Sequence, residues 1–417
     1  MTEWKTYKLS DICDLVAGFA FKSKDFGDYP NKVVKIADIQ PPIVYVNDLA
    51  GVDLSAYNTS KLQKFIVSKG DYVLAMTGAT IGKLGRITNN IEAYINQRVL
   101  TLRPNKTIVD KNYLYYQLCS VNFSKYILNH IDSETAQPNI SAGSVGGFEF
   151  SLPSLEEQRR IAGILGAIDD KIENNRRINA NLEFQAQALY KQWFVDFEFP
   201  NEKGKPYKSS GGKMVDSELG LIPEGWSVGK LEDIGDIIGG GTPSKVVAEY
   251  YTKNGIAWIT PKDLSVSHLK FTAKGETDIT ELGYKNSSAK IMPRGSVLFS
   301  SRAPIGYISI AKNDICTNQG FKSVVPNNGC TAFVYYFLLS NTENIESKAT
   351  GSTFKEASGA LIKSLELVIP SDDILEKFEK IMSPIFESQE KFEVENETLT
   401  TLRDTLLPKL INGEIKL

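Results

Sequence analysis

The residues of this chain with the clearest chemical potential lie in two loops that combine glycine with hydrogen-bonding side chains. The first loop spans residues 76–83 and the second spans residues 300–306. Hydroxyl, amide, ammonium and guanidinium groups on glycine-permitted turns can reach phosphate oxygens and base edges. The loops therefore predict contacts with nucleic acid. The same residues could instead serve turns and buried amide hydrogen bonds, and the sequence leaves that alternative open.

Further polar segments accompany each loop in the same order. An Asn-Gln pair follows the first loop at residues 96–97 and the second at residues 318–319. Residues 136–141 and 351–355 precede the last strand expected in each half. The candidate DNA-binding residues of these segments and their neighbours are Thr77, Thr80, Lys83, Arg86, Gln97, Arg98, Gln137, Asn139, Lys262, Ser300, Ser301, Arg302, Gln319, Ser352, Thr353 and Lys355.

Motifs for catalysis are missing from the sequence. His130 and His268 are the only histidines and occupy non-equivalent positions, so neither a histidine triad nor a histidine metal site is expected. Residues 78–84 lack the spacing of a nucleotide-binding phosphate loop and the Ser or Thr that would follow its lysine. Residues 239–241 lack the last glycine of a dinucleotide fingerprint and are interpreted as a turn. We therefore expect no catalytic residue, metal or cofactor in this chain.

The elements that position these loops belong to a tandem duplication. Residues 1–197 and 225–417 carry the same landmarks in the same order, with an offset that drifts by only a few positions along the chain. Trp4 returns as Trp226, the pair at residues 115–116 returns at 335–336, and the run at 152–154 returns at 369–371. A period this long indicates duplication of a whole module, unlike the short periods of solenoids.

Each module is expected to have an α+β fold. Segments such as residues 72–75 and 297–299 are short, rich in β-branched and aromatic residues and bounded by turn residues, as is typical of strands. Residues 112–128 and 332–340 predict aromatic-rich helices packed on those strands.

A long helix is predicted after each module because apolar residues recur at 4-3 spacing, which is typical of a coiled-coil seam. We expect the two helices to pair in antiparallel orientation, because the second must return along the first. Pro384 predicts a kink or a restart of the second helix. The seam positions are Ile161, Leu165, Ile168, Ile172, Asn175, Asn179, Leu182, Ala186, Leu189 and Trp193, followed in the second copy by Ile374, Phe378, Ile381, Ile385, Ser388, Phe392, Glu395, Leu399, Leu402 and Leu406.

The predicted organisation is two pseudo-symmetric recognition domains joined by two long helices that form an antiparallel coiled coil. Domain 1 covers residues 1–153 and its helical spacer covers 154–199. Residues 200–224, rich in Lys, Gly, Ser and Pro, are interpreted as an exposed linker. Domain 2 covers residues 225–370 and the second spacer covers 371–417.

Composition is that of an ordinary soluble protein. The formal net charge of −3 argues neither for nor against nucleic-acid binding, because a basic face can coexist with an acidic total. The four cysteines lie far apart, which favours a reducing cytoplasm over a disulfide framework or a zinc site. The apolar run at residues 15–21 is too short for a membrane segment, so no membrane association is expected.

Several longer motifs together make the chain resemble the specificity subunit of type I restriction-modification systems. The resemblance covers essentially the whole length. The motifs are LPSLEEQRRI at residues 152–161, IDDKIE at 168–173, LYKQWFVDF at 189–197, GKMVDSELG at 212–220, IPEGW at 222–226 and LRDTLLPKLINGEI at 402–415.

This resemblance implies a specific function, whereas the residues alone only limit the range of possible functions. Such subunits have two target recognition domains, each of which reads one half of a split sequence in double-stranded DNA, and they have no catalytic activity or cofactor of their own. Two modification subunits would bring S-adenosylmethionine and methylate adenine, and restriction subunits would add ATP-driven translocation and cleavage. The helices would set the spacing of the half-sites and dock the modification subunits.

Two alternatives stay open at this point. One is a noncatalytic coiled-coil adaptor, against which the divergence of the two loop sets counts, since a symmetric scaffold needs no such difference. The other is a self-sufficient DNA methyltransferase or nuclease, which is disfavoured because no nucleotide or S-adenosylmethionine motif is intact.

Overall fold

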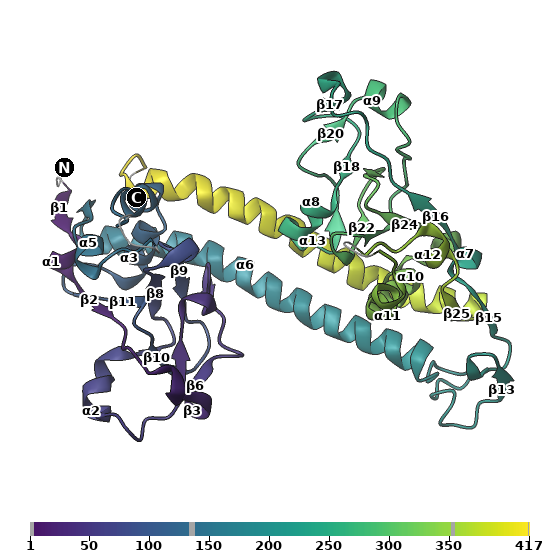
Figure 1. Ribbon diagram of the computed structural model, residues 1–417, viewed down its shortest axis with the longest axis horizontal. Coiled ribbons are helices and arrows are strands. Elements are labelled where there is room, and N and C mark those ends of the chain that lie inside the picture. The colour runs from purple at the N-terminus through teal and green to yellow at the C-terminus, as the bar shows by residue number, and fades with distance from the viewer. Residues whose placement is uncertain (1–3, 133–137, 352–354, 416) are drawn as a thin grey trace. The chain divides into compact units, whose positions relative to one another are not determined.

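The computed structural model describes residues 4–132, 138–351, 355–415 and 417 (Figure 1). The chain divides into two units, each considered by itself below. Unit 1 comprises residues Met1–Ile172 and Thr398–Leu417, and unit 2 comprises Glu173–Glu397.

Unit 1 contains two main sheets, drawn in purple and blue in Figure 1. A strand pair, β1 (Lys5–Lys8) with β12 (Glu149–Leu152), joins the two ends of its recognition domain. The larger sheet has the order β2 (Cys13–Ala17), β11 (Val99–Pro104), β8 (Tyr72–Ala75), β9 (Leu84–Arg86), β5 (Ile43–Val44) and β4 (Ile39–Gln40). The second has the order β6 (Ala50–Val52), β3 (Phe26–Val34), β10 (Glu92–Ile95) and β7 (Ile66–Ser68).

The aromatic helix expected at residues 112–128 is two helices. Asp110 accepts hydrogen bonds from the first backbone amides of α3 (Lys111–Leu118), and Ser120 caps α4 (Val121–Asn129) through the amide of Phe123. Ser120 begins a new helix because its side chain replaces the missing intrahelical partner. The short helices that complete the domain are α1 (Leu9–Ile12), α2 (Thr59–Leu62) and α5 (Ala142–Gly146).

Unit 2 repeats the central sheet and thereby confirms the duplication. Its sheet has the order β16 (Gly235–Gly239), β24 (Lys322–Pro326), β21 (Val297–Ser301), β22 (Ile305–Ala311) and β19 (Phe271–Thr272). In unit 1 Cys13 of β2 lies opposite Pro104 of β11, and in unit 2 Gly235 of β16 lies opposite Pro326 of β24. Gly235 follows Cys13 by the same number of residues as Pro326 follows Pro104, so the two units share the strand register as well as the strand order.

The remaining elements of unit 2 cover this sheet or extend from it. A pair of β15 (Ser227–Lys230) and β25 (Glu366–Ile369) matches the β1–β12 pair of unit 1. The others are α7 (Leu231–Ile234), β17 (Tyr251–Thr252), β18 (Trp258–Ile259), α8 (Pro261–Ser267), β20 (Asp278–Ile279), α9 (Glu281–Lys285), β23 (Cys316–Thr317), α10 (Thr331–Ser340), α11 (Thr342–Lys348) and α12 (Gly359–Lys363).

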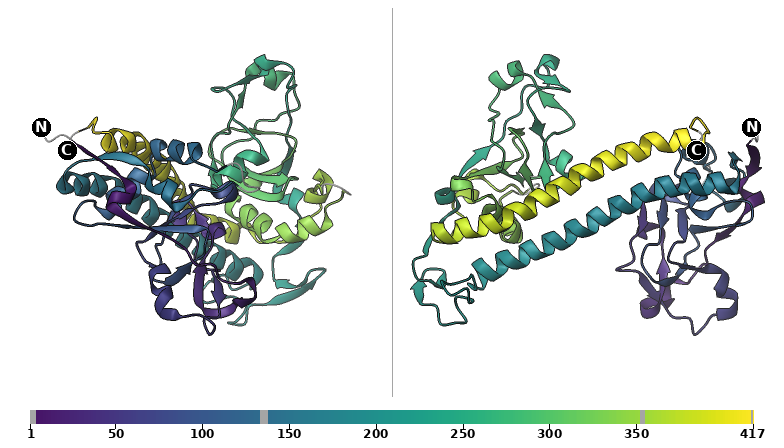
Figure 2. Two further views of the ribbon diagram at one scale, coloured as in Figure 1. Left: turned by 60° about the vertical axis from the view of Figure 1, so that its left-hand side comes forward. Right: turned by 180° about the vertical axis from the view of Figure 1, so that it is seen from behind.

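Two long helices, α6 (Leu155–Tyr190) and α13 (Asp372–Ile411), lie side by side within each unit (Figure 2). In unit 1, Ile161 and Leu165 share a buried cluster with Leu410. In unit 2, the Nδ2 of Asn175 lies 3.0 Å from the Oδ1 of Asn396, and that of Asn179 lies 3.2 Å from the backbone oxygen of Gln389. Partner numbers fall as α6 advances, so the predicted antiparallel coiled coil is confirmed.

Two details of the helical regions differ from expectation. α13 continues through Pro384 without a restart, and the hydroxyl of Ser388 donates to the Pro384 carbonyl at 2.7 Å. α6 ends in a π-helical turn, Lys191–Val195, which carries Trp193 and Phe194 into the buried core of unit 2. The π-helix is rare in proteins and occurs mostly as a single turn.

The segment interpreted as an exposed linker has structure of its own. Residues Met214–Ser217 (β13) and Gly220–Pro223 (β14) form a hairpin. Phe199 stacks between Tyr207 and Trp226, with ring centroids 4.5 and 4.8 Å away. The linker interpretation omitted this stack of Phe199, Tyr207 and Trp226 because its rings are spaced irregularly along the chain.

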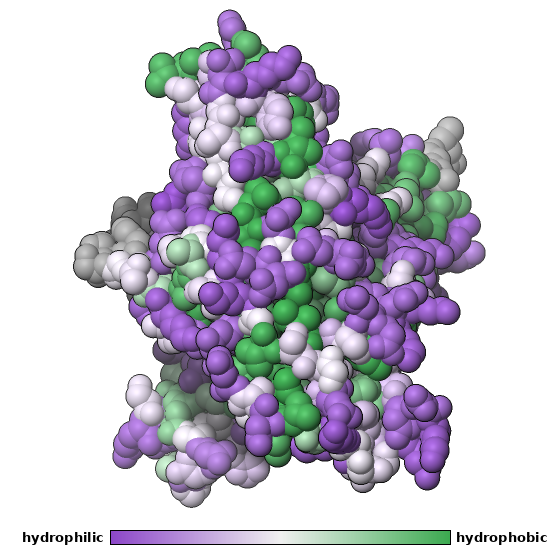
Figure 3. All heavy atoms as spheres, turned by 90° about the vertical axis from the view of Figure 1, so that its right-hand side faces the viewer, coloured by the Kyte–Doolittle hydropathy of each residue, from purple (hydrophilic) through white to green (hydrophobic). Residues whose placement is uncertain are grey.

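On the face shown in Figure 3, hydrophilic residues predominate and hydrophobic residues form a narrow, interrupted band.

Candidate nucleic-acid interface

Backbone hydrogen bonds bring three predicted segments of unit 1 together. The amide of Met76 donates to the carbonyl of Arg98 at 3.0 Å, and the amide of Ile140 donates to the carbonyl of Met76 at 3.0 Å. A third bond, 2.9 Å long, joins the amide of Gly78 to the carbonyl of Pro138. Gly78 and Gly82 have φ values of 70° and 80°, which only glycine adopts readily. The loop at 76–83 is therefore anchored to both other segments.

The candidate side chains of this cluster divide into exposed and supporting groups. Lys83, Gln97 and Arg98 are exposed, whereas Thr80 is half-buried. Thr77 is buried and donates to the Oδ1 of half-buried Asn139 at 3.2 Å. Gln137 lies outside the described residues. The exposed residues can reach a ligand, while Thr77 holds the segments together.

Arg86 lies apart from this cluster. Its Nη2 donates to the Oδ1 of Asn112 at 3.3 Å. Together with Tyr116, and with Arg159 and Asp170 of α6, it lines a cavity of about 360 Å³. Arg86 ends β9, and the alternation of side chains along that strand directs it toward the helices.

Unit 2 assembles its segments in the same way. The amide of Ser301 donates to the carbonyl of Gly320 at 2.7 Å, and the amide of Ala357 donates to the carbonyl of Ser301 at 2.9 Å. The loop at 300–306 is thus joined to the Asn-Gln segment and to Ala357, which follows the segment at 351–355. Ser352 and Thr353 lie outside the described residues.

Ser300 and Ser301 are buried residues that support this loop by hydrogen bonds. Both are fully buried. The hydroxyl of Ser300 donates to the carbonyl of Pro304 and accepts from the amide of Tyr307, each at 2.8 Å. That of Ser301 donates to the carbonyl of Gly320 at 3.1 Å. Both hydroxyls are used in hydrogen bonds to backbone groups of the loop and its neighbours, so these serines support the loop and do not contact DNA in our proposal.

Three candidate residues of unit 2 line one open cavity of about 660 Å³, namely Lys262, Arg302 and Gln319. The Nζ of Lys262 lies 2.8 Å from the Oε2 of Glu276, and this hydrogen bond raises the pKa of Lys262. The Nη1 of Arg302 lies 3.4 Å from the Oε2 of Glu356. Lys355 is exposed and lies outside the cavity lining.

The prediction from sequence missed other residues of the cavity lining, among them Thr242, Tyr251 and Trp258. A signal existed in the glycines before Thr242. A Cβ on Gly240 would lie 1.9 Å from the backbone oxygen of Asn318, and one on Gly18 would lie 2.2 Å from that of Asn96. These two close approaches occupy matching positions of the duplication and place the start of each module against its Asn-Gln segment.

Comparison with known proteins agrees with this duplicated arrangement. The profile of the type I restriction modification DNA specificity domain matches residues 1–184 and again residues 223–401. The chain belongs to this family. The specificity subunit of such a system is its noncatalytic DNA-recognition component, so the present chain is not an enzyme.

Individual relatives span the whole specificity subunit or one half of it. The chain is 28% identical over 477 residues to the type I restriction enzyme HindI specificity subunit of Haemophilus influenzae, covering 100% of both chains. It is 39% identical over 190 residues to the MjaIX specificity subunit of Methanocaldococcus jannaschii, covering 45% of this chain and 44% of that one. The crystal structure of a type I system S subunit from M. genitalium has the same fold, with a TM-score of 0.60 and 15% identity over 98% of this chain and 96% of that one.

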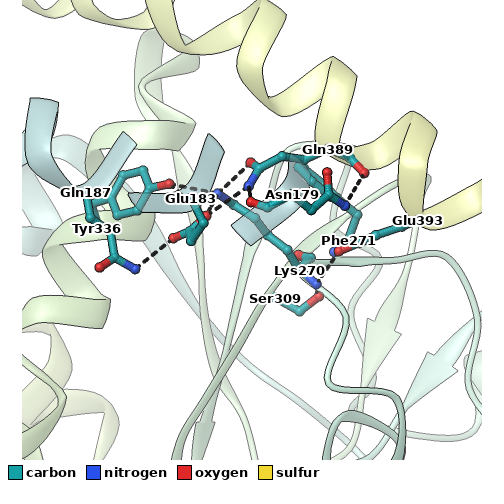
Figure 4. A network of polar contacts seen from close by, with 9 residues as sticks. All are labelled: Asn179, Glu183, Gln187, Lys270, Phe271, Ser309, Tyr336, Gln389 and Glu393. Carbon is teal, nitrogen blue, oxygen red and sulfur yellow. Dashed lines mark hydrogen bonds and ion pairs between the residues drawn. The ribbon is translucent and has the colours of Figure 1, made fainter. Parts of the chain in front are cut away.

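A buried cation connects the recognition domain of unit 2 to the helices of the specificity subunit (Figure 4). The Nζ of Lys270 lies 2.6 Å from the Oε2 of Glu183 on α6, 2.8 Å from the Oη of Tyr336 and 3.0 Å from the Oε1 of Gln389 on α13. It also lies 4.0 Å from the ring centroid of Phe386. Only 8% of the Lys270 side chain is exposed. Burial lowers the pKa of Lys270 to about 8, against the opposing effect of Glu183.

Glu393 of α13 completes this connection through the backbone. Its two carboxylate oxygens accept from the amides of Lys270 and Phe271 at 3.0 and 3.2 Å. Burial raises the pKa of Glu393 to about 7, although these amides favour the charged form. The start of β19 is therefore held to both helices by its main chain and by its lysine side chain.

Among the described residues, no group of His, Cys, Asp and Glu could hold a metal ion. No helix of the described parts of the chain is long and apolar enough to cross a membrane.

Proposed function

We propose that each recognition domain reads one half of a split DNA target, with unit 1 and unit 2 reading different sequences. The observation that supports this most directly is the pair of three-segment loop clusters. They share a backbone hydrogen-bond scaffold and a matched glutamine, Gln97 in unit 1 and Gln319 in unit 2, but the cations near it differ. These are Lys83 and Arg98 in unit 1, and in unit 2 Arg302 together with Lys262 of α8, which lines the same cavity. A common scaffold with divergent polar groups suits two related sites that read different base edges.

Substitution of the two glutamines tests the half-site assignment. In complexes reconstituted with the modification subunits, Gln319→Ala should relax one base pair of one half-site and Gln97→Ala one base pair of the other. The loss of discrimination should be about 1 to 3 kcal/mol, because each change removes a base contact. The measurement is methylation of a DNA library with both half-sites randomised. Lys208→Ala, an exposed change outside both clusters, is the matched control and should alter neither half.

Uniform weakening of every sequence by both glutamine variants would contradict this assignment, because phosphate contacts position the protein without reading bases.

We also propose that the helices dock the modification subunits. On α6, Phe184 is 75% exposed, and Ala180 and Ala188 are exposed one helical turn to either side. These three residues define a docking stripe. A large aromatic side chain on a helix, flanked by small residues that permit close approach, suits a hydrophobic partner surface. The assembly would contain two modification subunits, joined by restriction subunits in the cytoplasm.

Phe184→Asp should weaken assembly with the modification subunit by at least tenfold, because the interface would have to bury the new carboxylate. The chain should remain folded, because the side chain at position 184 is exposed before assembly. Titration of labelled modification subunit measures the change. Gln185→Asp adds the same charge to the next exposed position and is the control. Equal affinity of both variants and the parent chain would place the docking surface elsewhere.

A further inference from the structure

The side chain of Gln319 has a partner inside the cavity of unit 2. The hydroxyl of Thr242 donates to the Oε1 of Gln319. Both residues line the 660 Å³ cavity, and Gln319 is exposed to it. An amide side chain that is free in solution samples several rotamers, and ordering it on binding costs free energy. A hydrogen bond from a fixed hydroxyl can order the glutamine side chain before DNA binds, which lowers this cost.

Thr242 is itself held on both sides. The preceding residue, Gly241, donates its amide to the carbonyl of Thr317 at 2.9 Å and accepts from the indole nitrogen of Trp258 at 2.9 Å. The following residue, Pro243, accepts from the hydroxyl of Tyr251 at 2.6 Å. The backbone at Thr242 is therefore anchored by two aromatic side chains and a main-chain bond.

The backbone that carries Gln319 is equally restrained. The amide of Asn318 donates to the carbonyl of Ile259 at 2.9 Å, and its Oδ1 accepts from the amide of Gly320 at 2.8 Å. The hydroxyl and the amide it contacts thus project from two anchored segments, so their approach is a property of the fold.

Unit 1 lacks the equivalent hydroxyl. Gly18 and Gly240 donate to the carbonyls of Val99 and Phe321, and both members of this bond are displaced equally along the sequence. The same displacement pairs Gln97 with Gln319 and Ala20 with Thr242. Ala20 is exposed and has no hydroxyl to donate. The two modules therefore differ in how they can position matched glutamines.

We propose that Thr242 is a positioning residue for base reading, which holds the Oε1 of Gln319 so that its amide nitrogen faces an acceptor on a base edge, such as a purine N7. This inference rests on the proposed function of the loop clusters. Gln319 contacts the base, and Thr242 acts through it. Unit 1 reads its matched position with a freer glutamine and should discriminate less sharply there.

The test uses the full chain assembled with its modification subunits and the library with both half-sites randomised. Thr242→Val, which removes the hydroxyl and keeps the shape, should reduce discrimination at the base pair read by Gln319 by roughly 2- to 10-fold, the amount expected from freeing one side chain. The other half-site should be unaffected. Thr242→Ser keeps a hydroxyl and should retain the discrimination.

Ala20→Thr in unit 1 is the reciprocal variant and should sharpen discrimination at the position read by Gln97, a gain that damage to the fold cannot produce. Unchanged discrimination in both Thr242→Val and Ala20→Thr, or equal weakening for all sequences, would overturn the positioning role. If Gln319→Ala still relaxes one half-site in that case, the proposed function stands without it. If Gln319→Ala also has no sequence-dependent effect, the proposed function itself fails.

Discussion

Lys270→Met is expected to lower the free energy of unfolding of unit 2 by about 3 to 5 kcal/mol. Methionine preserves most of the aliphatic volume that packs on Phe386, but it removes the cation that neutralises Glu183. Glu183 is only 25% exposed, so its carboxylate would be left poorly solvated and without its nearest positive charge. Denaturant unfolding followed by tryptophan fluorescence measures this loss, because Trp193, Trp226 and Trp258 all belong to unit 2.

Two further variants separate the buried charge from the loss of a lysine in general. Lys262→Met removes an ion pair whose members are both 71% exposed and should change stability by less than about 1 kcal/mol. The double variant Lys270→Met with Glu183→Gln should recover part of the loss, since no uncompensated charge remains. A loss below about 1 kcal/mol for Lys270→Met would show that water solvates Glu183 in its place.

Lys270 illustrates what sequence periodicity cannot reveal. Part of the apolar seam was predictable, because Ile161, Leu165 and Phe378 repeat at a period set by the helix itself and all three are fully buried. The predicted seam positions Ile381 and Leu402 were wrong, since these side chains are 43% and 45% exposed. Lys270 lies next to a short strand in a segment without a regular pattern. Its burial depends on three elements that meet only in the folded chain, so its own sequence neighbourhood contains no sign of it.

The loop clusters were predictable for a different reason. Duplication placed glycine and polar residues at matching positions, and the structure joins those positions by matching hydrogen bonds. Which side chains point outward was not predictable. Ser300 and Ser301 have side chains of a type that often contacts DNA, yet their hydroxyls donate to backbone carbonyls of neighbouring segments instead. Arg86 is close to the loop in sequence, but strand alternation directs it toward Asn112.

Both connections between the two units run through the long helices. The chain passes between the two units only at residues 172–173 and 397–398, once in α6 and once in α13. We propose that the helical length at this point determines the number of base pairs between the half-sites. A lengthened specificity subunit should therefore methylate a sequence with a wider gap and unchanged halves.

The variant that tests this inserts a copy of residues 166–172 after Ile172 and a copy of residues 391–397 after Glu397. Each insertion is one heptad, so the 4-3 seam continues and the contacts within each unit are retained. Seven residues add about 10 Å of helix, which corresponds to about three base pairs of DNA at about 3.4 Å each. Sequencing of methylated sites in cells that carry the variant and its modification subunit measures the gap.

The same heptad inserted in α6 alone is the informative control, because it leaves the two helices with unequal lengths. The helix pair could then not keep the packing of Ile161 with Leu410 in unit 1 and the polar contacts of Asn175 with α13 in unit 2 in one register, and we expect an unstable or inactive chain. Recovery of activity when α13 receives its matching heptad would show that the pair acts as one spacer. An active doubly lengthened chain that still methylates the original gap would instead mean that DNA or the partner subunits absorb the added length, and the helices would have no part in spacing.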